Sequence, residues 1–285
     1  MPSLFRRALL LAALLPLATT TACAFQVSES SLIRPVAAGP LSAEALAQAA
    51  PGLSLEPHTI IAPDGARLSA VLLRRPGAKI TILYFGGNQF TVGRLGPAAA
   101  RMLAPLDANL MLVDHRGYGQ SLGVPNAGNL LTDGVAVFDH LARLPEVDPG
   151  KIVVHGQSLG SLVAGHVAAA RPMAGVVLES SITTTEQWVR SQSRGMPVQI
   201  SPALAGLGNQ RSIGRIDEPL LILVGAADAT TPPSLSEALY RLSPLPADRK
   251  TLAVIEGAGH NGVLMQQAGQ EAYRAFLGRV AAVAR

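Results

Sequence analysis

The sequence predicts an α/β fold in which helices cover both faces of a mostly parallel central sheet. From about residue 79 to the C-terminus, short runs rich in Leu, Ile and Val alternate with segments of helical pattern, an order typical of βαβ units. The runs are apolar throughout, as expected for strands buried on both faces. A chain of 285 residues, 48% apolar and 15% charged, can bury the core of one such domain.

The predicted strands are short apolar runs bounded by turn residues. They cover His58–Ile61, Arg67–Leu73, Lys79–Phe85, Leu110–Val113, Lys151–His155, Gly175–Leu178, Leu220–Val224 and Thr251–Ile255. The first two form an antiparallel hairpin, because Asp64-Gly65 between them is a preferred two-residue turn. The others are expected to be mainly parallel, because helical segments connect most of them.

The predicted helices cover Leu41–Ala50, Pro97–Leu103, Leu130–Leu144, Ser161–Ala170 and Gln266–Val283. Pro97 is placed at the first helical position, where a missing amide hydrogen costs nothing. Between Ser181 and Ile216 the alternation breaks, and no clear strand is present. An insertion of that length after a sheet strand predicts a short helical cap over the site, at about residues 181–216 of a domain that covers residues 57–285.

Residues 1–24 have the pattern of an export signal. Phe5-Arg6-Arg7 precedes the apolar run Ala8–Ala18, which is too short to span a bilayer as a helix. Two processing routes fit the end of this leader. Cleavage after Ala24 would release a soluble periplasmic protein, whereas Thr20-Thr21-Ala22-Cys23 resembles a lipobox that would make Cys23 a lipidated first residue and anchor the protein to a membrane, facing the periplasm.

Residues 25–56 are weakly patterned and contain three prolines, so we expect a tether or an N-terminal extension. Cys23 is the only cysteine, which excludes an intramolecular disulfide. With three lysines and no basic stripe, nucleic acid is not an expected partner. No metal-binding cluster, dinucleotide fingerprint or P-loop is visible, so we expect neither a metal nor a cofactor.

The segment Gly156-Gln157-Ser158-Leu159-Gly160 lies between a predicted strand and a predicted helix. A serine at such a sharp turn is a nucleophile elbow: the turn exposes the hydroxyl, and the helix start directs free amides at developing negative charge. Glycine is needed on both sides, because a Cβ there would collide with the neighbouring strand and helix. We therefore expect Ser158 to be a catalytic nucleophile.

A serine nucleophile needs a base, and His260 is the one histidine that follows both the elbow and a suitable acid. Asp228, just after the strand Leu220–Val224, is the expected acid that orients it. Glu179, at the end of the preceding strand, is the alternative acid, and its other interpretation is a polar residue that anchors the cap.

The remaining candidates are expected to be structural. His155 and His166 flank the elbow but should lie within its strand and helix, and Asp114 should cap the loop Arg116–Gly119. His58, His115 and His140 have no context that indicates catalysis.

Five segments together resemble a serine hydrolase of the α/β-hydrolase superfamily, and in particular the bacterial and eukaryotic subgroup with a Gly-Asn oxyanion loop. They are Gly86-Gly87-Asn88, Asp114–Ser121, Gly156–Gly160, Gly225–Asp228 and Gly257–His260. The chain order Ser158, Asp228, His260 is the order that this fold uses. The resemblance implies an α/β-hydrolase fold and an oxyanion hole formed by the backbone amides of Leu159 and Asn88, although relatives usually carry histidine at the position of Gly86.

The expected function is an exported serine hydrolase that cleaves carboxylic esters or thioesters through an acyl-enzyme. Eukaryotic relatives with this loop are depalmitoylating thioesterases, so an acylated or small-molecule substrate is implied. Two alternatives stay open: a serine aminopeptidase-like hydrolase, which the short cap disfavours, and a non-catalytic lipoprotein that retains the fold. Within the cap, Trp188, Val189, Met196 and Val198 are expected either to wall an acyl pocket above Ser158 or to seal the cap onto the sheet.

Overall fold

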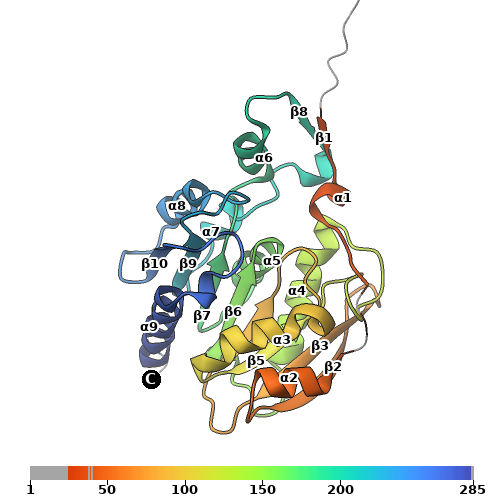
Figure 1. The fold of residues 1–285 in the computed structure, drawn as a ribbon, viewed down its shortest axis with the longest axis vertical. Coiled ribbons are helices and arrows are strands. Elements are labelled where there is room, and N and C mark those ends of the chain that lie inside the picture. Colours follow the sequence, from red (N-terminus) through yellow and green to blue (C-terminus); the bar gives the residue numbers. More distant parts are fainter. Residues whose placement is uncertain (1–24, 38, 40, 284–285) are drawn as a thin grey trace, which may run out of the picture.

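A computed structural model of the protein describes residues 25–37, 39 and 41–283, which contain an eight-stranded sheet of order β10-β9-β7-β6-β4-β5-β3-β2 (Figure 1). All neighbours pair in parallel except β2 with β3 and β3 with β5, so the mostly parallel sheet and the antiparallel N-terminal hairpin are confirmed. The strands are β2 Ser54–Ile61, β3 Arg67–Arg74, β4 Thr81–Phe85, β5 Asn109–Val113, β6 Ile152–Gln157, β7 Gly175–Glu179, β9 Leu220–Gly225 and β10 Lys250–Ile255.

Helices cover both faces of this sheet, which gives two apolar layers. One layer packs α2, α3 and α9 against the sheet, and the other packs α4, α5 and α8. These helices are α2 Ala43–Ala49, α3 Val92–Leu103, α4 Ala127–Leu141, α5 Leu159–Ala168, α8 Pro233–Leu242 and α9 Gln267–Val283. The described chain also has short 3₁₀ turns at Ala104–Leu106, Pro149–Lys151, Pro202–Leu204 and Val263–Met265.

Helix α3 begins at Val92, five residues earlier than predicted, and Pro97 lies inside it. Two side chains set this start: Thr91 Oγ1 accepts the amide of Arg94, and Asp114 Oδ1 accepts the amide of Val92 at 2.6 Å. The capping contacts therefore outweigh the preference of proline for the first turn. The other oxygen of Asp114 accepts the amide of Gln120 at 2.9 Å, so Asp114 has the structural role expected of it.

The inserted stretch 181–216 forms α6 (Thr185–Ser193), β8 (Val198–Ile200) and α7 (Gln210–Ile213). The expectation that it contains no strand is wrong, because β8 pairs in parallel with β1 (Phe25–Val27) from the start of the described chain. Figure 1 shows this two-stranded sheet beside α6, away from the central sheet. Neither strand is recognisable alone, since each is three residues long and its partner lies far away in sequence.

Residues 25–37 are a folded extension and not a tether. After β1 come the short helix α1 (Glu29–Leu32) and Ile33, whose side chain is 4% exposed. Ile33 packs in an apolar cluster with Tyr118 and Leu162, which fixes this segment on the domain. The predicted leader and Cys23 lie outside the described residues. Within the described part, no helix is long and apolar enough to cross a membrane.

Candidate active site

The backbone makes a sharp turn at Ser158, between β6 and α5. Ser158 adopts φ 53° and ψ −115°, a conformation that residues other than glycine rarely hold. A Cβ on Gly156 would lie 2.1 Å from the carbonyl oxygen of Gly160, and a Cβ on Gly160 would lie 2.0 Å from that of Phe85. Strand and helix are therefore in contact at both glycines, for the steric reason that the sequence suggested.

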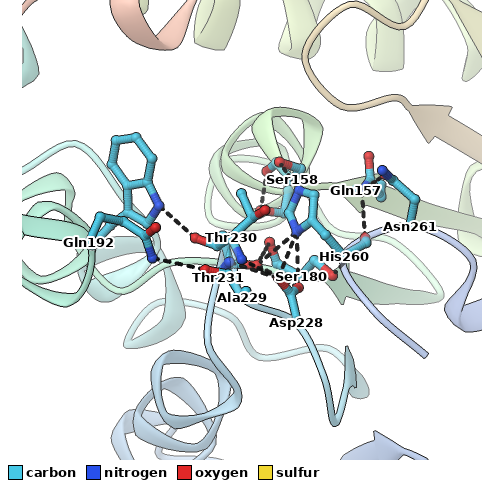
Figure 2. A network of polar contacts seen from close by, with 12 residues as sticks. Gln157, Ser158, Ser180, Gln192, Asp228, Ala229, Thr230, Thr231, His260 and Asn261 are labelled. Carbon is cyan, nitrogen blue, oxygen red and sulfur yellow. Dashed lines mark hydrogen bonds and ion pairs between the residues drawn. The ribbon is translucent and has the colours of Figure 1, made fainter. Parts of the chain in front are cut away.

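Ser158, His260 and Asp228 form one hydrogen-bonded chain (Figure 2). His260 Nε2 lies 3.0 Å from Ser158 Oγ, and His260 Nδ1 lies 3.0 and 2.9 Å from the two oxygens of Asp228. With the proton on Nδ1 donated to Asp228, Nε2 faces the serine hydroxyl as an acceptor. The structure thus brings together the three side chains singled out from the sequence, which come from three separate loops.

The carboxylate of Asp228 is buried and held by several donors. Oδ1 accepts the amides of Thr230 and Thr231 at 2.9 and 2.8 Å, and Oδ2 accepts the Thr231 hydroxyl at 2.8 Å. Burial raises the pKa of Asp228, but the hydrogen bonds from His260 and Thr231 lower it by more, so its pKa lies below the ordinary value. Asp228 is therefore an ionised acceptor for His260.

The loop that carries His260 is tied to the strands on which it rests. The carbonyl oxygen of His260 accepts hydrogen bonds from Gln157 Nε2 and Ser180 Oγ, each at 3.3 Å. Gln157 Nε2 also donates to Asn261 Oδ1, and these contacts are visible in Figure 2. Gln157 directly precedes Ser158 at the end of β6, so its side chain connects the strand that carries the nucleophile to the loop that carries His260.

Glu179 does not contact His260 in any hydrogen bond of the described residues. Its Oε2 lies 3.0 Å from Nε2 of His155, a fully buried ring in the adjacent strand, and its carbonyl accepts the amide of Ser158 at 2.9 Å. The expectation that Glu179 anchors the cap is therefore wrong. Its side chain instead provides a hydrogen-bonding partner for the buried ring of His155, because buried polar groups are normally paired.

The Gly86-Gly87-Asn88 loop lies directly against the serine. A Cβ on Gly87 would lie 2.1 Å from Gln157 Oε1 and 3.3 Å from Ser158 Cβ, so a larger residue there would displace the side chain of Gln157. The ring of His115 lies 2.8 Å from the carbonyl oxygen of Gly86 and can donate to it. Burial lowers the pKa of His115, which keeps the ring neutral. Nothing in the sequence indicated a role for His115, but its hydrogen bond to Gly86 fixes this loop.

Two backbone amides near the serine remain free to bind a ligand. Among the described residues, neither the amide of Leu159 nor that of Asn88 donates a hydrogen bond. Leu159 is the first residue of α5, where amides have no partner within the helix and the helix dipole favours negative charge. The Asn88 side chain, by contrast, makes hydrogen bonds with Leu32, Arg34, Gln89 and Tyr118.

An apolar cavity of about 50 Å³ adjoins Ser158. It is lined by Leu32, Ser158, Leu159, Leu162, Ser180, Ile182, Trp188, Thr230 and Thr231. Trp188 therefore lies where an acyl pocket was expected, and its Nε1 donates to the carbonyl of Thr230 at 2.8 Å. The acyl-pocket prediction is wrong for Met196, Val189 and Val198, which do not line this cavity and instead line a second one with Phe25 and Trp188.

Several positioning residues were not found from the sequence. Thr231 holds Asp228, Gln157 and Ser180 hold the loop of His260, and His115 holds the glycine loop. A signal existed for Thr231, since an aspartate often accepts amides two and three residues later. No group of three or more metal-ligating side chains occurs among the described residues.

Comparisons with known proteins agree with this architecture. A family model described as Hydrolase_4, serine aminopeptidase S33, matches residues 77–204. An uncharacterized protein of Mycobacterium tuberculosis is 33% identical over 156 residues, 55% of this chain and 54% of that protein, so the match spans about half of its length. Alpha/beta hydrolase domain-containing protein 17B of Xenopus tropicalis is 28% identical over 205 residues, 70% of this chain and 67% of that protein.

Among solved structures, the Pyrococcus furiosus esterase Pf2001 is similar in fold. Its TM-score is 0.68 at 19% identity, over 87% of this chain and 98% of the esterase. At that level of identity the likeness concerns the fold. Together with the sheet order and the turn at Ser158, these matches show that the chain has the α/β-hydrolase fold.

Proposed function

We propose that this protein is a serine hydrolase that cleaves carboxylic esters or thioesters through an acyl-enzyme intermediate. The observation that carries the proposal is the hydrogen-bonded chain from Ser158 Oγ through both nitrogens of His260 to Asp228. This arrangement raises the nucleophilicity of a serine, because the imidazole can accept its proton while the buried carboxylate stabilises the imidazolium.

In the first half-reaction, Ser158 Oγ attacks the acyl carbon and His260 Nε2 accepts the hydroxyl proton. The tetrahedral intermediate then breaks its bond to the leaving oxygen or sulfur, which takes the proton from Nε2. In the second half-reaction, water attacks the acyl-enzyme and loses a proton to Nε2. Ser158 leaves with that proton, and a carboxylic acid is released.

The amides of Leu159 and Asn88 would bind the oxyanion of both tetrahedral intermediates. Both lack another acceptor among the described residues, and the position of Leu159 at the start of α5 adds the favourable end of the helix dipole. The Gly87-Asn88 pair supports the assignment to the subgroup with a Gly-Asn oxyanion loop. Amides held in this way need no reorganisation as charge develops, which is the main source of their effect.

A serine aminopeptidase is the second candidate, because the matching family model is described by that activity. The described cap is small, with α6 and α7 as its only α-helices, and this supports the ester or thioester assignment. Parallel assays with p-nitrophenyl esters and amino-acid p-nitroanilides separate the two. Faster turnover of the anilides would favour the peptidase.

Replacing Ser158 by alanine tests the proposal. Ser158→Ala should lower ester turnover by about a million-fold, because the nucleophile is lost while the site around it remains. Ser54→Ala is the matched control, since Ser54 is an exposed serine at the start of β2, the edge strand of the sheet. The proposal fails if purified Ser158→Ala keeps more than a few per cent of the wild-type rate, and the non-catalytic alternative is favoured if the wild type turns over no ester, thioester or anilide.

We also propose that the protein is exported and anchored through Cys23, with the residues before Cys23 as the leader that is removed. The observations behind this are the basic and apolar segments at the N-terminus and the position of the single cysteine directly after them. Metabolic labelling with a radioactive fatty acid, in a bacterium that expresses the wild type or Cys23→Ser, measures the modification. Label on the variant, or a wild type found wholly in the soluble periplasmic fraction, would contradict the anchor.

A further inference from the structure

The segment 25–37 is attached to the domain at points on both sides of the candidate active site. On the cap side, β1 pairs with β8, and the carbonyl of Val27 accepts the amide of Ser201 at 2.9 Å. On the opposite side, the carbonyl of Val36 accepts the amide of Gly119 at 3.0 Å. Between these contacts the segment passes next to the cavity at Ser158.

Asn88 attaches the middle of this segment to the glycine loop. Its Nδ2 donates to the carbonyl of Leu32 at 2.9 Å, and its Oδ1 accepts the amide of Arg34 at 3.1 Å. Tyr118 donates its hydroxyl to the same oxygen at 2.8 Å, and burial raises the pKa of Tyr118 to about 12, so this donor persists at all physiological pH values. The residue expected to supply an oxyanion-binding amide thus also determines where Leu32 lies.

Two further contacts fix the orientation of Leu32. Glu29, one turn earlier in α1, accepts the amide of Ala127 at 2.7 Å, and Ile33 is buried against the domain. Leu32 lies between these contacts, and its half-buried side chain lines the cavity beside Ser158. The same cavity is walled by Leu159, Leu162, Ile182 and Trp188.

The size of this cavity and the apolar character of its walls indicate which class of acyl group fits it. A volume of about 50 Å³ accommodates on the order of four water-sized groups. Its walls are mainly aliphatic and aromatic, so it favours an apolar group over a charged one. An acetyl, propionyl or butyryl group fits such a space, whereas a longer chain would have to displace Leu32 or Trp188.

We propose that the segment 25–37 completes the acyl site, and that Leu32 limits it to short acyl groups of about two to four carbons. The inference rests on the proposed ester or thioester hydrolysis at Ser158 and names its substrate class. Leu32 is a specificity residue and not a catalytic one, because its side chain contacts the acyl group and takes no part in proton transfer. The N-terminal extension is then required for selectivity as well as for stability.

Chain-length profiles of the full chain test this directly. With p-nitrophenyl acetate, butyrate and octanoate, the wild type should show higher kcat/KM for acetate and butyrate than for octanoate. Leu32→Ala should raise the octanoate-to-acetate ratio of kcat/KM by at least about tenfold, because one removed side chain opens room for additional methylenes. Leu32→Phe should shift the profile in the opposite direction, with butyrate losing more than acetate.

Leu122→Ala is the matched control, since Leu122 is a leucine that is 59% exposed and lies outside the cavity. It should leave the profile unchanged, and thermal unfolding identifies any variant that is not folded. Leu32→Phe keeps the test decisive if Leu32→Ala does not fold. A wild type that prefers octanoate, or folded Leu32 variants with the wild-type profile, would overturn the inference while leaving the proposed function intact. A wild type without activity on all three esters, and without reaction with a fluorophosphonate, would instead overturn the proposed function.

Discussion

Asp228 combines almost complete burial with full ionisation, and its neighbours explain how. Two backbone amides, one hydroxyl and the imidazole of His260 point at its two oxygens. Each of these donors stabilises the charged form, so the pKa of Asp228 stays below its ordinary value although burial opposes this. The residue can therefore accept a hydrogen bond from Nδ1–H of His260 over the whole neutral range.

Replacing Asp228 by asparagine should lower kcat for esters by about ten-thousand-fold near pH 7. An amide at this position favours the wrong tautomer of His260, whose Nε2 then carries the proton and cannot accept another. Glu179→Gln is the matched control, because it makes the same change in charge on the neighbouring strand but at the contact with His155. If Glu179→Gln were the more damaging of the two, the acid would be Glu179.

The residues of the proposed catalytic chain could be predicted from the sequence, whereas the residues that position them or line the cavity could not. Ser158, Asp228 and His260 lie in loops whose glycine spacing and chain order are typical of a serine nucleophile with its base and acid. His115 and Gln157 carry no such signal, because their roles depend on carbonyl oxygens brought close by the fold. The role of Leu32 could not be predicted for the same reason, because the local sequence does not distinguish a leucine that lines a pocket from any other leucine.

At the scale of elements, the elbow brings strands and helix into close backbone contact. Gly160→Ala should abolish most activity and lower the free energy of unfolding by about 1–3 kcal/mol, because its Cβ would lie 2.0 Å from the carbonyl oxygen of Phe85. That contact is with backbone, so relief requires α5 to move and Ser158 to move with it.

Gly278→Ala provides the comparison for this substitution. Gly278 lies in α9, and a Cβ added there would meet no neighbouring atom within 4 Å, so alanine should be neutral or stabilise by about 0.4–1 kcal/mol. Urea titrations and ester assays of both variants measure the effects. Equal behaviour of the two glycine variants would contradict the proposed close packing at the elbow.

The strands of the central sheet were predicted well because each is a continuous apolar run. The elements that differ depend on distant partners, with one exception. Helix α3 starts early because Asp114 accepts the amide of Val92, and β8 exists because β1 pairs with it. Helix α8 is the exception: it was not predicted, although Leu235, Ala238, Leu239 and Leu242 follow helical spacing.

At the scale of the whole molecule, buried histidines make stability depend on pH. Burial lowers the pKa of His115, and the same cause acts at His58, His140 and His166. Below about pH 6.5 the unfolded chain binds protons that the folded protein does not bind, so the free energy of unfolding should fall as the pH decreases from 7 to 5.

The substitution His115→Gln tests the contribution of one histidine to this pH dependence. Glutamine can still donate to the carbonyl of Gly86 but does not titrate, so the loss of stability between pH 7 and 5 should be less steep by up to about 1.4 kcal/mol per pH unit. Urea unfolding at a series of pH values gives the two slopes. Parallel pH dependences for the variant and the wild type would show that folding does not lower the pKa of His115.

The central claim, that Ser158 is an activated nucleophile, is tested most directly by covalent labelling. A fluorophosphonate should form one phosphorus–oxygen bond to Ser158 Oγ and release fluoride, and mass spectrometry of the digested protein locates the adduct, with fragmentation separating Ser158 from Ser161. We predict a single adduct on Ser158 that an ester substrate slows and that Ser158→Ala abolishes. An unlabelled wild type, or labelling of Ser158→Ala at the wild-type rate, would contradict the account.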